Sequence, residues 1–496
     1  MNSRSLPVVK TGIPDFDAIL RGGLPQNRLH LIEGAPGTGK TTIAQRFLLQ
    51  GIECGERCLY VTLSESTEEL TSAAMTHGWS LDGIDILEVV PEEEDLGRQQ
   101  TVLYPAEVEF GQTISRITAH IAKVAPARVV IDSLSDLRML AHDPLLYRRQ
   151  LLALKRFLQG RKITTVVLDD LSGKSDGNPH SLVHGVIALE QLERDYGKAR
   201  RRLRIVKMRG TDMQTGWHDF SITPQEVFVF PSLIADEHRI EIVGAPVRSG
   251  IAGLDKVLNG GLDRGTSTLL VGPSGVGKSS MALCFAMAVV RQGEYASYFT
   301  LEETFENFSC RAEALGIPVK SAVEKKQLGW RLTNPSRLSP GEFVWQVRRE
   351  VEDKGARLIV IDSLNSYLGT IEEEQTLILQ MHELLTYLNN QGVVTILILA
   401  QRGIVSDVQN PIDMSFLSDN VVLLRYFEAA GELRKALSVV KRRTGAHDNA
   451  IHEYRVLPNG MQVGPAISGL QGIFTGVPTY TGSRHTLMNG DHDARE

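Results

Sequence analysis

The chain carries the same series of motifs twice, and this duplication constrains its fold more than any other feature. "TGIPDFDAILRGGLP" (11–25) matches "SGIAGLDKVLNGGLD" (249–263), and "ARVVIDSLSDL" (127–137) matches "ARLIVIDSLNSY" (356–367). The matched segments lie roughly 230 to 240 residues apart, whereas solenoid repeats have periods of about 20–50 residues. The 496 residues therefore encode a duplicated domain rather than a repeat array.

The domain organisation follows from this duplication. We predict a first domain over residues 1–238, a second over 239–470 and a flexible tail over 471–496. In each copy, short β-branched runs alternate with longer helical stretches, and continuous apolar strands between helices are typical of parallel sheets covered on both faces. The predicted fold class is α/β, with two tandem domains that each contain a mostly parallel twisted sheet flanked by helices.

Composition narrows the functional classes. Apolar residues make up 42% of the chain and charged residues 23%, as in soluble globular proteins. The net charge of −6 argues against an extended nucleic-acid surface. The longest apolar run, residues 281–290, is too short to span a bilayer, and the start lacks the apolar core of a secretory signal. Four scattered cysteines are too few for a disulfide framework, so we expect a cytoplasmic protein without membrane contact.

Two glycine-rich segments fit the phosphate-binding motif G-x4-G-K-[ST]. They are "GAPGTGKT" (34–41) and "GPSGVGKS" (272–279), and each follows an expected strand and opens an expected helix. The backbone N–H groups of such a turn, together with a helix N-terminus, direct partial positive charge at triphosphate oxygens. An accidental glycine turn is the alternative, but here the motif occurs twice in the right context. The residues predicted to bind ATP are Gly37, Thr38, Gly39, Lys40, Thr41, Thr42, Gly275, Val276, Gly277, Lys278, Ser279 and Ser280.

Each copy also has an aspartate at the end of an apolar strand, Asp132 in the first and Asp362 in the second. In P-loop proteins such a carboxylate holds Mg²⁺ together with the hydroxyl that follows the motif lysine. A buried aspartate with a purely structural role is the alternative, and the motif upstream favours the metal role. The predicted Mg²⁺ ligands are Thr41, Asp132, Ser279 and Asp362.

A third repeated phrase is "YVTLSES" (60–66), which matches "YFTLEET" (298–304). It ends an expected strand, at the edge where α/β sheets bind their ligands. A carboxylate there can orient or deprotonate an attacking water or hydroxyl. The second copy carries a Glu-Glu pair at the point where the first carries Ser-Glu. The residues predicted to act in catalysis are Glu65, Glu302 and Glu303.

These motifs, in this order and in duplicate, resemble the KaiC family of RecA-like ATPases. The resemblance rests on the opening segment 12–42, the paired P-loops, the glutamate at the end of the next strand, and a K-x-R strand near the end of each copy. It implies two tandem RecA-like domains that assemble into a two-tiered homohexamer with ATP bound between subunits. It further implies an ATPase ring formed by the first domain, autokinase and autophosphatase activity in the second, and KaiB-like or other regulatory partners.

The resemblance also assigns a role to the K-x-R strands. "IVKMRGT" (205–211) and "VVKRRTG" (439–445) match the basic pair that, in the family, reaches the γ-phosphate of the neighbouring subunit. A cation there stabilises the charge that builds up on the transferred phosphoryl group. A solvated basic strand paired with surface acids and a DNA-binding stripe are the alternatives. The residues predicted to contact ATP in trans are Lys207, Met208, Arg209, Lys441, Arg442 and Arg443.

Two positions depart from the family pattern. Ser64 replaces the leading glutamate of the first copy, and because serine is not a base near neutral pH, we predict weak turnover there, carried by Glu65. The Ser-Thr phosphoacceptor pair of the family corresponds to Ser415 and Phe416, which excludes a two-residue phosphorylation cycle. Our hypothesis is a single-site autokinase with Glu302 as base and Ser415 as acceptor. An ordinary loop serine is the alternative.

Together with the motifs, the family resemblance implies a hexameric ring that binds and hydrolyses ATP with Mg²⁺ and phosphorylates itself, in signalling or circadian-type timing. One alternative is a nucleotide-gated assembly scaffold with little turnover, which Ser64 favours. The other is a RecA-like DNA recombinase or helicase, which would require basic DNA loops or an accessory DNA-binding domain. The acidic net charge argues against this second alternative.

Overall fold

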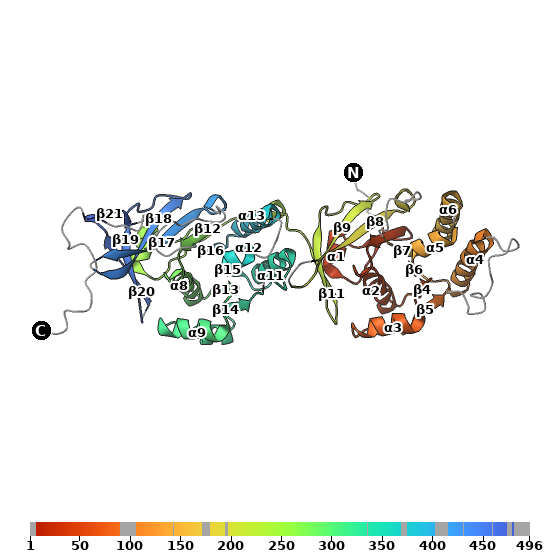
Figure 1. The fold of residues 1–496 in the computed structure, drawn as a ribbon, viewed down its shortest axis with the longest axis horizontal. Helices are drawn as coiled ribbons and strands as arrows, with labels where there is room; N and C mark the ends of the chain where they lie inside the picture. The colour runs from red at the N-terminus through yellow and green to blue at the C-terminus, as the bar shows by residue number, and fades with distance from the viewer. Residues whose placement is uncertain are drawn as a thin grey trace. The chain divides into compact units, whose positions relative to one another are not determined.

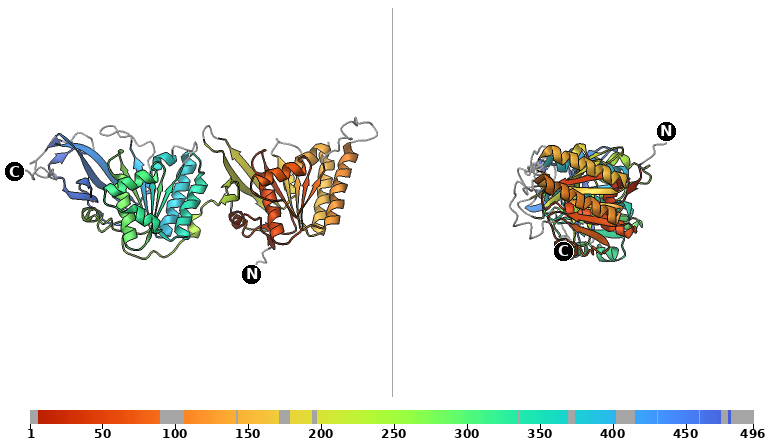
Figure 2. Two further views of the ribbon diagram at one scale, coloured as in Figure 1. Left: turned by 90° about the horizontal axis from the view of Figure 1, so that it is seen from below. Right: turned by 90° about the vertical axis from the view of Figure 1, so that its right-hand side faces the viewer.

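The computed structural model describes residues 6–89, 106–141, 143–170, 179–193, 197–334, 336–368, 374–401, 415–429, 431–458, 460–473 and 479–480. The chain divides into two compact units, Met1–Ser232 and Leu233–Glu496 (Figure 1). Within the described residues, each unit contains one nine-stranded sheet with helices on both faces (Figure 2). The predicted fold class, two tandem α/β domains, is confirmed.

The domain bounds 1–238, 239–470 and 471–496 stay predictions. Of the expected tail, only residues 471–473 and 479–480 belong to the described part of the chain. Among the described residues, no helix combines the length and the apolar character that crossing a bilayer requires.

The strands of the first sheet are β3 (Leu29–Gly34), β4 (Cys58–Thr62), β5 (Ile84–Glu88), β6 (Arg128–Asp132), β7 (Thr164–Asp170), β8 (Gly185–Leu192), β9 (Arg200–Met208), β10 (His218–Ile222) and β11 (Val227–Phe230). Their order is β11-β10-β9-β8-β3-β7-β6-β4-β5. Neighbours from β8 to β5 are parallel, whereas β9, β10 and β11 extend one edge antiparallel. A separate ribbon pairs β1 (Val8–Val9) with β2 (Leu24–Pro25).

The helices of the first unit are α1 (Pro14–Ile19), α2 (Lys40–Glu53), α3 (Thr67–Met75), α4 (Ala106–Val124), α5 (Leu134–Ala141), α6 (Pro144–Gly160) and the 3-10 turn η1 (Pro179–Ser181). The 3-10 turn η2 (Ala235–Glu237) belongs to the second unit. Successive residues of a strand point to opposite faces of the sheet, so apolar strands expose apolar side chains on both faces. The helices cover these two faces. In β6, Val130 packs in the cluster that contains α1, α2 and α3, whereas Val129 and Ile131 pack in the cluster of α4, α5 and α6. Two-sided burial explains why these strands are continuously apolar.

The second sheet repeats the first strand for strand. Its strands are β12 (Ser267–Gly272), β13 (Tyr295–Thr300), β14 (Leu328–Leu332), β15 (Ala356–Asp362), β16 (Val394–Ala400), β17 (Asn420–Ala429), β18 (Glu432–Arg442), β19 (His452–Leu457) and β20 (Gly460–Ala466). The order β14-β13-β15-β16-β12-β17-β18-β19-β20 equals the first order read from its other end. Strands β12 and β16 therefore correspond to β3 and β7. A small ribbon pairs β21 (Leu470–Gln471) with β22 (Thr479–Tyr480).

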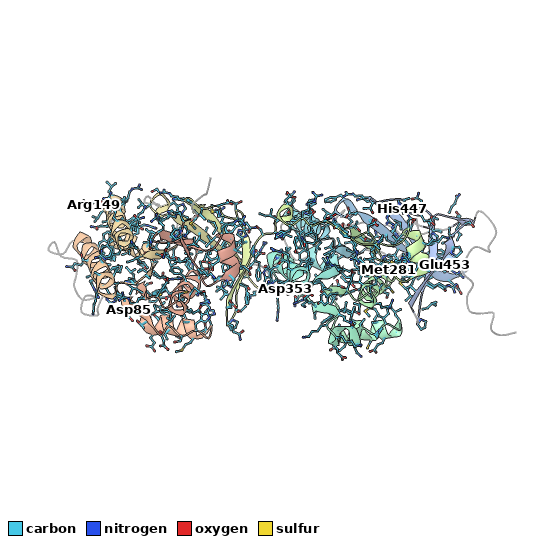
Figure 3. All side chains as sticks on the ribbon, turned by 180° about the vertical axis from the view of Figure 1, so that it is seen from behind. Asp85, Arg149, Met281, Asp353, His447 and Glu453 are labelled. Carbon is cyan, nitrogen blue, oxygen red and sulfur yellow. The ribbon has the colours of Figure 1, made fainter. Side chains whose placement is uncertain are left out.

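The helices of the second unit also form two layers. They are α7 (Ala252–Val257), α8 (Lys278–Arg291), α9 (Phe305–Ala314), α10 (Val319–Glu324), α11 (Pro340–Glu352), α12 (Leu364–Leu368), α13 (Glu374–Asn390) and the turn η3 (Ser415–Leu417). Helix α8 is apolar almost all round and lies in the core of one face, with Met281 pointing into that core (Figure 3). Helices α11 and α13 pack against the opposite face.

The parallel topology brings the motif segments to one edge of each sheet. The carboxyl ends of parallel strands meet at the same edge, and there α/β sheets bind their ligands. In the first sheet, Gly34 lies in register with Asp170, and Thr62 lies in register with Asp132. In the second sheet, Gly272 lies in register with Ala400. The segments that follow these residues are the candidate sites.

Candidate active sites

Each P-loop turns from a central strand into a helix through a glycine that no other residue can replace without strain. Gly39 has φ 102° and immediately precedes α2, and Gly277 has φ 115° and precedes α8. Both glycines adopt the left-handed region, where residues with a Cβ are strained. A Cβ on Gly39 would also lie 2.6 Å from the Ile222 side chain. The backbone path of both loops is thus fixed by glycine.

The lysine of each P-loop lies along the strand that precedes it. The Lys40 Nζ donates to the carbonyl oxygens of Gly34 (2.8 Å) and Ala35 (3.1 Å). The Lys278 Nζ makes the matching bonds to Gly272 (2.8 Å) and Pro273 (2.7 Å). Burial lowers the pKa of Lys278 to about 8, against the opposing charges of Asp362 and Glu302. Both ammonium groups are therefore held at the mouth of the loop.

The remaining predicted ATP-binding residues line the same two turns. Thr38 is buried and donates from its Oγ1 to the Ala35 carbonyl oxygen at 2.8 Å. Val276 is buried in the core, and Ser280 lies in the first turn of α8. Thr42 occupies the equivalent first turn of α2. The structure thus gathers every predicted ATP-binding residue at two loop-to-helix junctions, and their contact with ATP stays a prediction.

The predicted metal ligands of the first unit lie within hydrogen-bond distance of each other. Thr41 Oγ1 donates to Asp132 Oδ2 at 3.2 Å, and Tyr60 Oη donates to the same oxygen at 2.6 Å. Burial raises the pKa of Asp132, although the bonds from Tyr60 and Thr41 act in the opposite direction. A hydroxyl and a carboxylate are both hard oxygen ligands of the kind that Mg²⁺ takes.

The second unit repeats this arrangement. Tyr298 Oη donates to Asp362 Oδ2 at 2.6 Å. Burial raises the pKa of Asp362, and the hydrogen bonds of Ser279 and Tyr298 act against that rise. The two tyrosines open the repeated phrases of the sequence, and sequence reasoning missed them. Their repetition at the same place in both copies was the signal that could have found them.

The two glutamates of the second phrase have different surroundings. Glu302 Oε1 accepts hydrogen bonds from Ser363 Oγ at 3.0 Å and from Ser366 Oγ, on the segment that follows Asp362. Glu303 instead forms a bidentate ion pair with Arg311, at 2.6 Å to Nη2 and 3.1 Å to Nε. Of the two, Glu302 is the carboxylate whose charge acts on the P-loop lysine Lys278, whereas the charge of Glu303 acts on Asp362.

In the described part of the first unit, no arginine forms an ion pair with Glu65, the single glutamate of the first phrase. The Glu65 N–H donates to Thr62 Oγ1 at 3.0 Å, and this hydroxyl donates back to the Glu65 carbonyl oxygen at 2.7 Å. Partial burial and the charges of Asp132 and Glu69 raise the pKa of Glu65. The residue eight positions on is Ala73, where the second copy has Arg311. A carboxyl with a raised pKa is better suited to accept a proton than one held by a guanidinium.

The basic pairs at the ends of β9 and β18 make corresponding contacts in both units. Lys207 Nζ donates to the carbonyl oxygens of Val183 (3.0 Å) and His180, and Arg209 Nη2 donates to that of Ser181 at 3.1 Å. These carbonyls belong to the turn η1 and the residues just after it, which lead into β8. The lysine and the arginine therefore hold the first turn from one side.

The second pair holds η3 in the same way. Lys441 Nζ donates to the Ser418 carbonyl oxygen at 2.7 Å, and Arg443 Nη2 to that of Phe416 at 3.1 Å. The residues between the cations pack differently, because Met208 is buried and Arg442 pairs with Asp263 at 2.9 Å. Contacts of any of these side chains with a neighbour's ATP stay predictions.

Comparison with known proteins decides the family. A family model of the KaiC ATPases matches residues 9–234 and again residues 247–468, which together make up more than half of the chain. The chain belongs to the KaiC family. The predicted family resemblance is therefore confirmed, and with it the tandem RecA-like assignment.

Individual relatives are similar to this KaiC-family chain along almost its whole length. The Circadian clock oscillator protein KaiC of Acaryochloris marina is 27% identical over 96% of this chain and 92% of its own length. The Circadian clock protein KaiC3 of Synechocystis is 26% identical over 95% of both chains. The Circadian clock oscillator protein KaiC of Parathermosynechococcus lividus is 28% identical over 96% of this chain and 89% of its own length.

The predicted phosphoacceptor of this KaiC-family chain, Ser415, is the first residue of η3. The following Phe416, which the predicted resemblance aligns with the second acceptor of the family, is 53% exposed. In the first unit, His180 of η1 stands at the corresponding place and lies 2.7 Å from Glu33 through Nε2 and Oε2. Phosphorylation of Ser415 stays a prediction.

Sequence reasoning also missed a carboxylate next to the first P-loop lysine. Asp170 Oδ1 lies 2.7 Å from Lys40 Nζ. Its strand ends in "LDD", whereas the equivalent strand β16 ends in "ILA", so that Ala400 takes its place. A comparison of these two strand ends was the signal available in the sequence.

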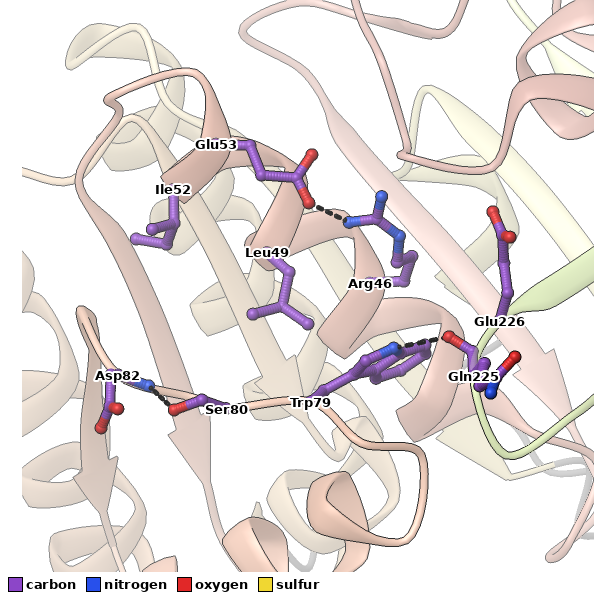
Figure 4. Close-up of a pocket in the computed structure, with 9 residues that line it drawn as sticks. All are labelled: Arg46, Leu49, Ile52, Glu53, Trp79, Ser80, Asp82, Gln225 and Glu226. Carbon is purple, nitrogen blue, oxygen red and sulfur yellow. Dashed lines mark hydrogen bonds and ion pairs between the residues drawn. The ribbon is translucent and has the colours of Figure 1, made fainter.

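A cavity of about 430 Å³ lies away from the P-loop, near the C-terminal end of α2 (Figure 4). Trp79 Nε1 donates to the Gln225 carbonyl oxygen at 3.0 Å, and Arg46 pairs with Glu53 at 2.9 Å. The cavity is lined by Arg46, Leu49, Ile52, Glu53, Trp79, Ser80, Asp82, Gln225 and Glu226. Because α2 begins at Lys40 and these residues occupy its later turns, the cavity is separate from the nucleotide site.

Proposed function

We propose that this KaiC-family ATPase binds Mg·ATP at both P-loops and hydrolyses it as a homohexamer, with each ATP at a boundary between protomers. The observation that carries the proposal is the hydrogen bond between Thr41, directly after the P-loop lysine, and Asp132, at the end of the apolar strand β6. Its repetition at Asp362 supports a second site. The relatives are named as circadian clock proteins, which supports a role in timing or signalling.

The side chains of each site divide the work of phosphoryl transfer. Lys40 and Lys278 would contact the phosphates, while the hydroxyl and the carboxylate of each unit would hold the metal. Bound Mg²⁺ would neutralise charge on the phosphate oxygens during transfer. Glu302, oriented by Ser363 and Ser366, would accept the proton of the attacking water or hydroxyl.

In the second unit we propose that the attacking hydroxyl is that of Ser415, which makes this unit a serine autokinase as well as an ATPase. What supports this is the position of Ser415 at the start of η3, the turn that Lys441 and Arg443 hold by its carbonyls. Arg209 and Arg443 are exposed, so a neighbouring protomer can approach both guanidinium groups. A cation donated across a protomer boundary would stabilise the transferred phosphoryl group. KaiB-like proteins are the proposed class of regulatory partner.

A nucleotide-gated scaffold with little turnover is a second candidate for the first unit. It is favoured by Ser64, which stands where the second copy has a glutamate, and by the ion pair between Asp170 and Lys40. In that case the first ring would bind nucleotide for assembly, while turnover would fall mainly to the second.

The test combines three measurements on the full chain. Native mass with and without Mg·ATP reports assembly, phosphate release reports hydrolysis, and mass spectrometry after incubation with ATP maps phosphorylation. We expect a nucleotide-dependent hexamer, measurable turnover and phosphate on Ser415, with Lys40→Ala/Lys278→Ala abolishing all three. A chain that stays monomeric in saturating Mg·ATP would contradict the ring. Phosphate on another residue, or on none, would remove Ser415.

A further inference from the structure

The ammonium group of the first P-loop lysine has three acceptors, which is as many as it has protons to donate. They are the carbonyl oxygens of Gly34 and Ala35 and the carboxylate of Asp170, at 2.8, 3.1 and 2.7 Å. The lysine side chain is 9% exposed and that of Asp170 36% exposed, so this ion pair lies at the mouth of the loop. In this state the lysine has no proton left for a phosphate oxygen.

The second P-loop lacks this carboxylate. Lys278 donates to the two equivalent carbonyl oxygens, and among the described residues no Asp or Glu forms an ion pair with it. The strand register explains the difference, because Gly34 lies beside Asp170 while Gly272 lies beside Ala400. The two sites thus share their backbone geometry, but the first lysine forms a direct ion pair with Asp170, whereas Asp362 and Glu302 act on the second lysine only through the charges of their side chains.

We propose that Asp170 lowers the affinity of the first site for Mg·ATP. Its carboxylate competes with nucleotide phosphate for Lys40, so that this site binds Mg·ATP more weakly than the second. The inference rests on the proposed function, namely that both P-loops bind nucleotide. A phosphate that approaches Lys40 must displace the carboxylate or remain close to its negative charge, and either outcome disfavours binding. Ala400 imposes no such cost on the second site.

Asp170 is placed to return to the lysine whenever the site empties. Ser135 Oγ lies 3.4 Å from its second carboxylate oxygen. The preceding residue, Asp169, forms an ion pair with Arg138 at 2.5 Å and is only 7% exposed. It therefore does not replace Asp170 as the partner of Lys40. The competition therefore depends on a single side chain, and one substitution removes it.

The test measures the Kd of each site for the magnesium complex of a fluorescent N-methylanthraniloyl ATP in the full chain. Lys278→Ala isolates the first site, and Lys40→Ala isolates the second. In the Lys278→Ala chain, we expect Asp170→Ala to lower the Kd about tenfold, which corresponds to about 1.4 kcal/mol. Asp170→Asn should do nearly the same, because it keeps the shape and removes the charge. In the Lys40→Ala chain, Ala400→Asp should raise the Kd by a similar factor.

Lys40→Ala/Lys278→Ala sets the baseline, and thermal melting followed by circular dichroism shows that each variant is folded. If the first site binds nucleotide above this baseline and neither Asp170 variant lowers the Kd, the inference is overturned while the proposed function stands. The same holds if only the hydrolysis rate changes, since Asp170 would then act on the water. Binding that never exceeds the baseline, with or without Asp170, overturns the proposed function of the first site and the inference with it.

Discussion

The first and second units have the same sheet order and the same P-loop path, yet they place their carboxylates differently. In the second unit, Glu302 is oriented by two serines, and Glu303 is tied to Arg311. In the first unit, serine takes the leading position, no arginine among the residues that the structure describes pairs with Glu65, and Asp170 forms an ion pair with the P-loop lysine. Relative to the second unit, the first therefore lacks the carboxylate of Glu302, which is replaced by Ser64. It has instead the carboxylate of Asp170 beside its P-loop lysine.

This difference separates what the backbone fixes from what single side chains decide. The phosphate-binding loops depend on left-handed glycines and on strand order, and both copies retain these features. Proton acceptance and lysine availability depend on one or two side chains at the strand ends, where the copies differ. We therefore expect both units to bind nucleotide on the same loop geometry, but with different affinities and different rates of turnover.

The largest expected effect concerns the two glutamates of the second unit. In a Lys40→Ala chain, which silences the first site, Glu302→Gln should lower ATP turnover roughly 10²- to 10³-fold, because it removes the proposed general base. Glu303→Gln should lower it less than about tenfold, since Arg311 already holds that carboxylate away from proton transfer. Steady-state phosphate release measures both. Equal losses in the two variants would contradict the division of roles.

The first unit should show a smaller absolute change from a lower starting rate. In a Lys278→Ala chain, Glu65→Gln should reduce the weak residual turnover about tenfold or more, because Glu65 is the proposed base there. Ser64→Glu, which recreates the second-copy pair, is the matched gain-of-function control and should raise turnover. If Glu65→Gln hydrolyses ATP as fast as its parent chain, Glu65 has no catalytic role.

The sequence predicted the duplicated α/β fold well because repetition and strand hydrophobicity are local or periodic signals. The P-loops and the strand-end aspartates could also be located, since each motif is contiguous or follows an apolar run. The pairs Lys40–Asp170 and Glu303–Arg311 were not predicted. The first joins the start of helix α2 to the end of strand β7, so it depends on the strand order that places β7 beside β3. The second forms because helix α9, which follows the strand, places Arg311 beside Glu303.

The tyrosines of the repeated phrase test the features that the two units share. Tyr60→Phe and Tyr298→Phe each remove a 2.6 Å hydrogen bond to a partly buried aspartate. Each should lower the free energy of unfolding by about 1–2 kcal/mol. Urea denaturation of the two variants measures the losses, which should be similar because the bonds are similar. A loss in only one unit would show that the two aspartate sites are less alike than their distances indicate.

The smallest expected effect transfers the arginine of the second unit to the first. Ala73→Arg, in the Lys278→Ala chain, should let a guanidinium reach Glu65 as Arg311 reaches Glu303, and so lower turnover at neutral pH by at most about fivefold. The pKa of Glu65 is raised by partial burial and by the charges of Asp132 and Glu69. Turnover that depends on its ionised form is present above this pKa and is lost as the pH falls through it.

A nearby guanidinium lowers the pKa of Glu65, so the acid limb of the turnover profile should move to lower pH in Ala73→Arg. The matched control is Ala73→Gln, which adds a long polar side chain without charge and should leave that limb in place. The profile of turnover against pH for the three chains separates charge from bulk. An acid limb that stays fixed in Ala73→Arg, or moves equally in Ala73→Gln, would mean that another group titrates. The contrast between the two glutamate sites would then lie in geometry rather than in their arginine.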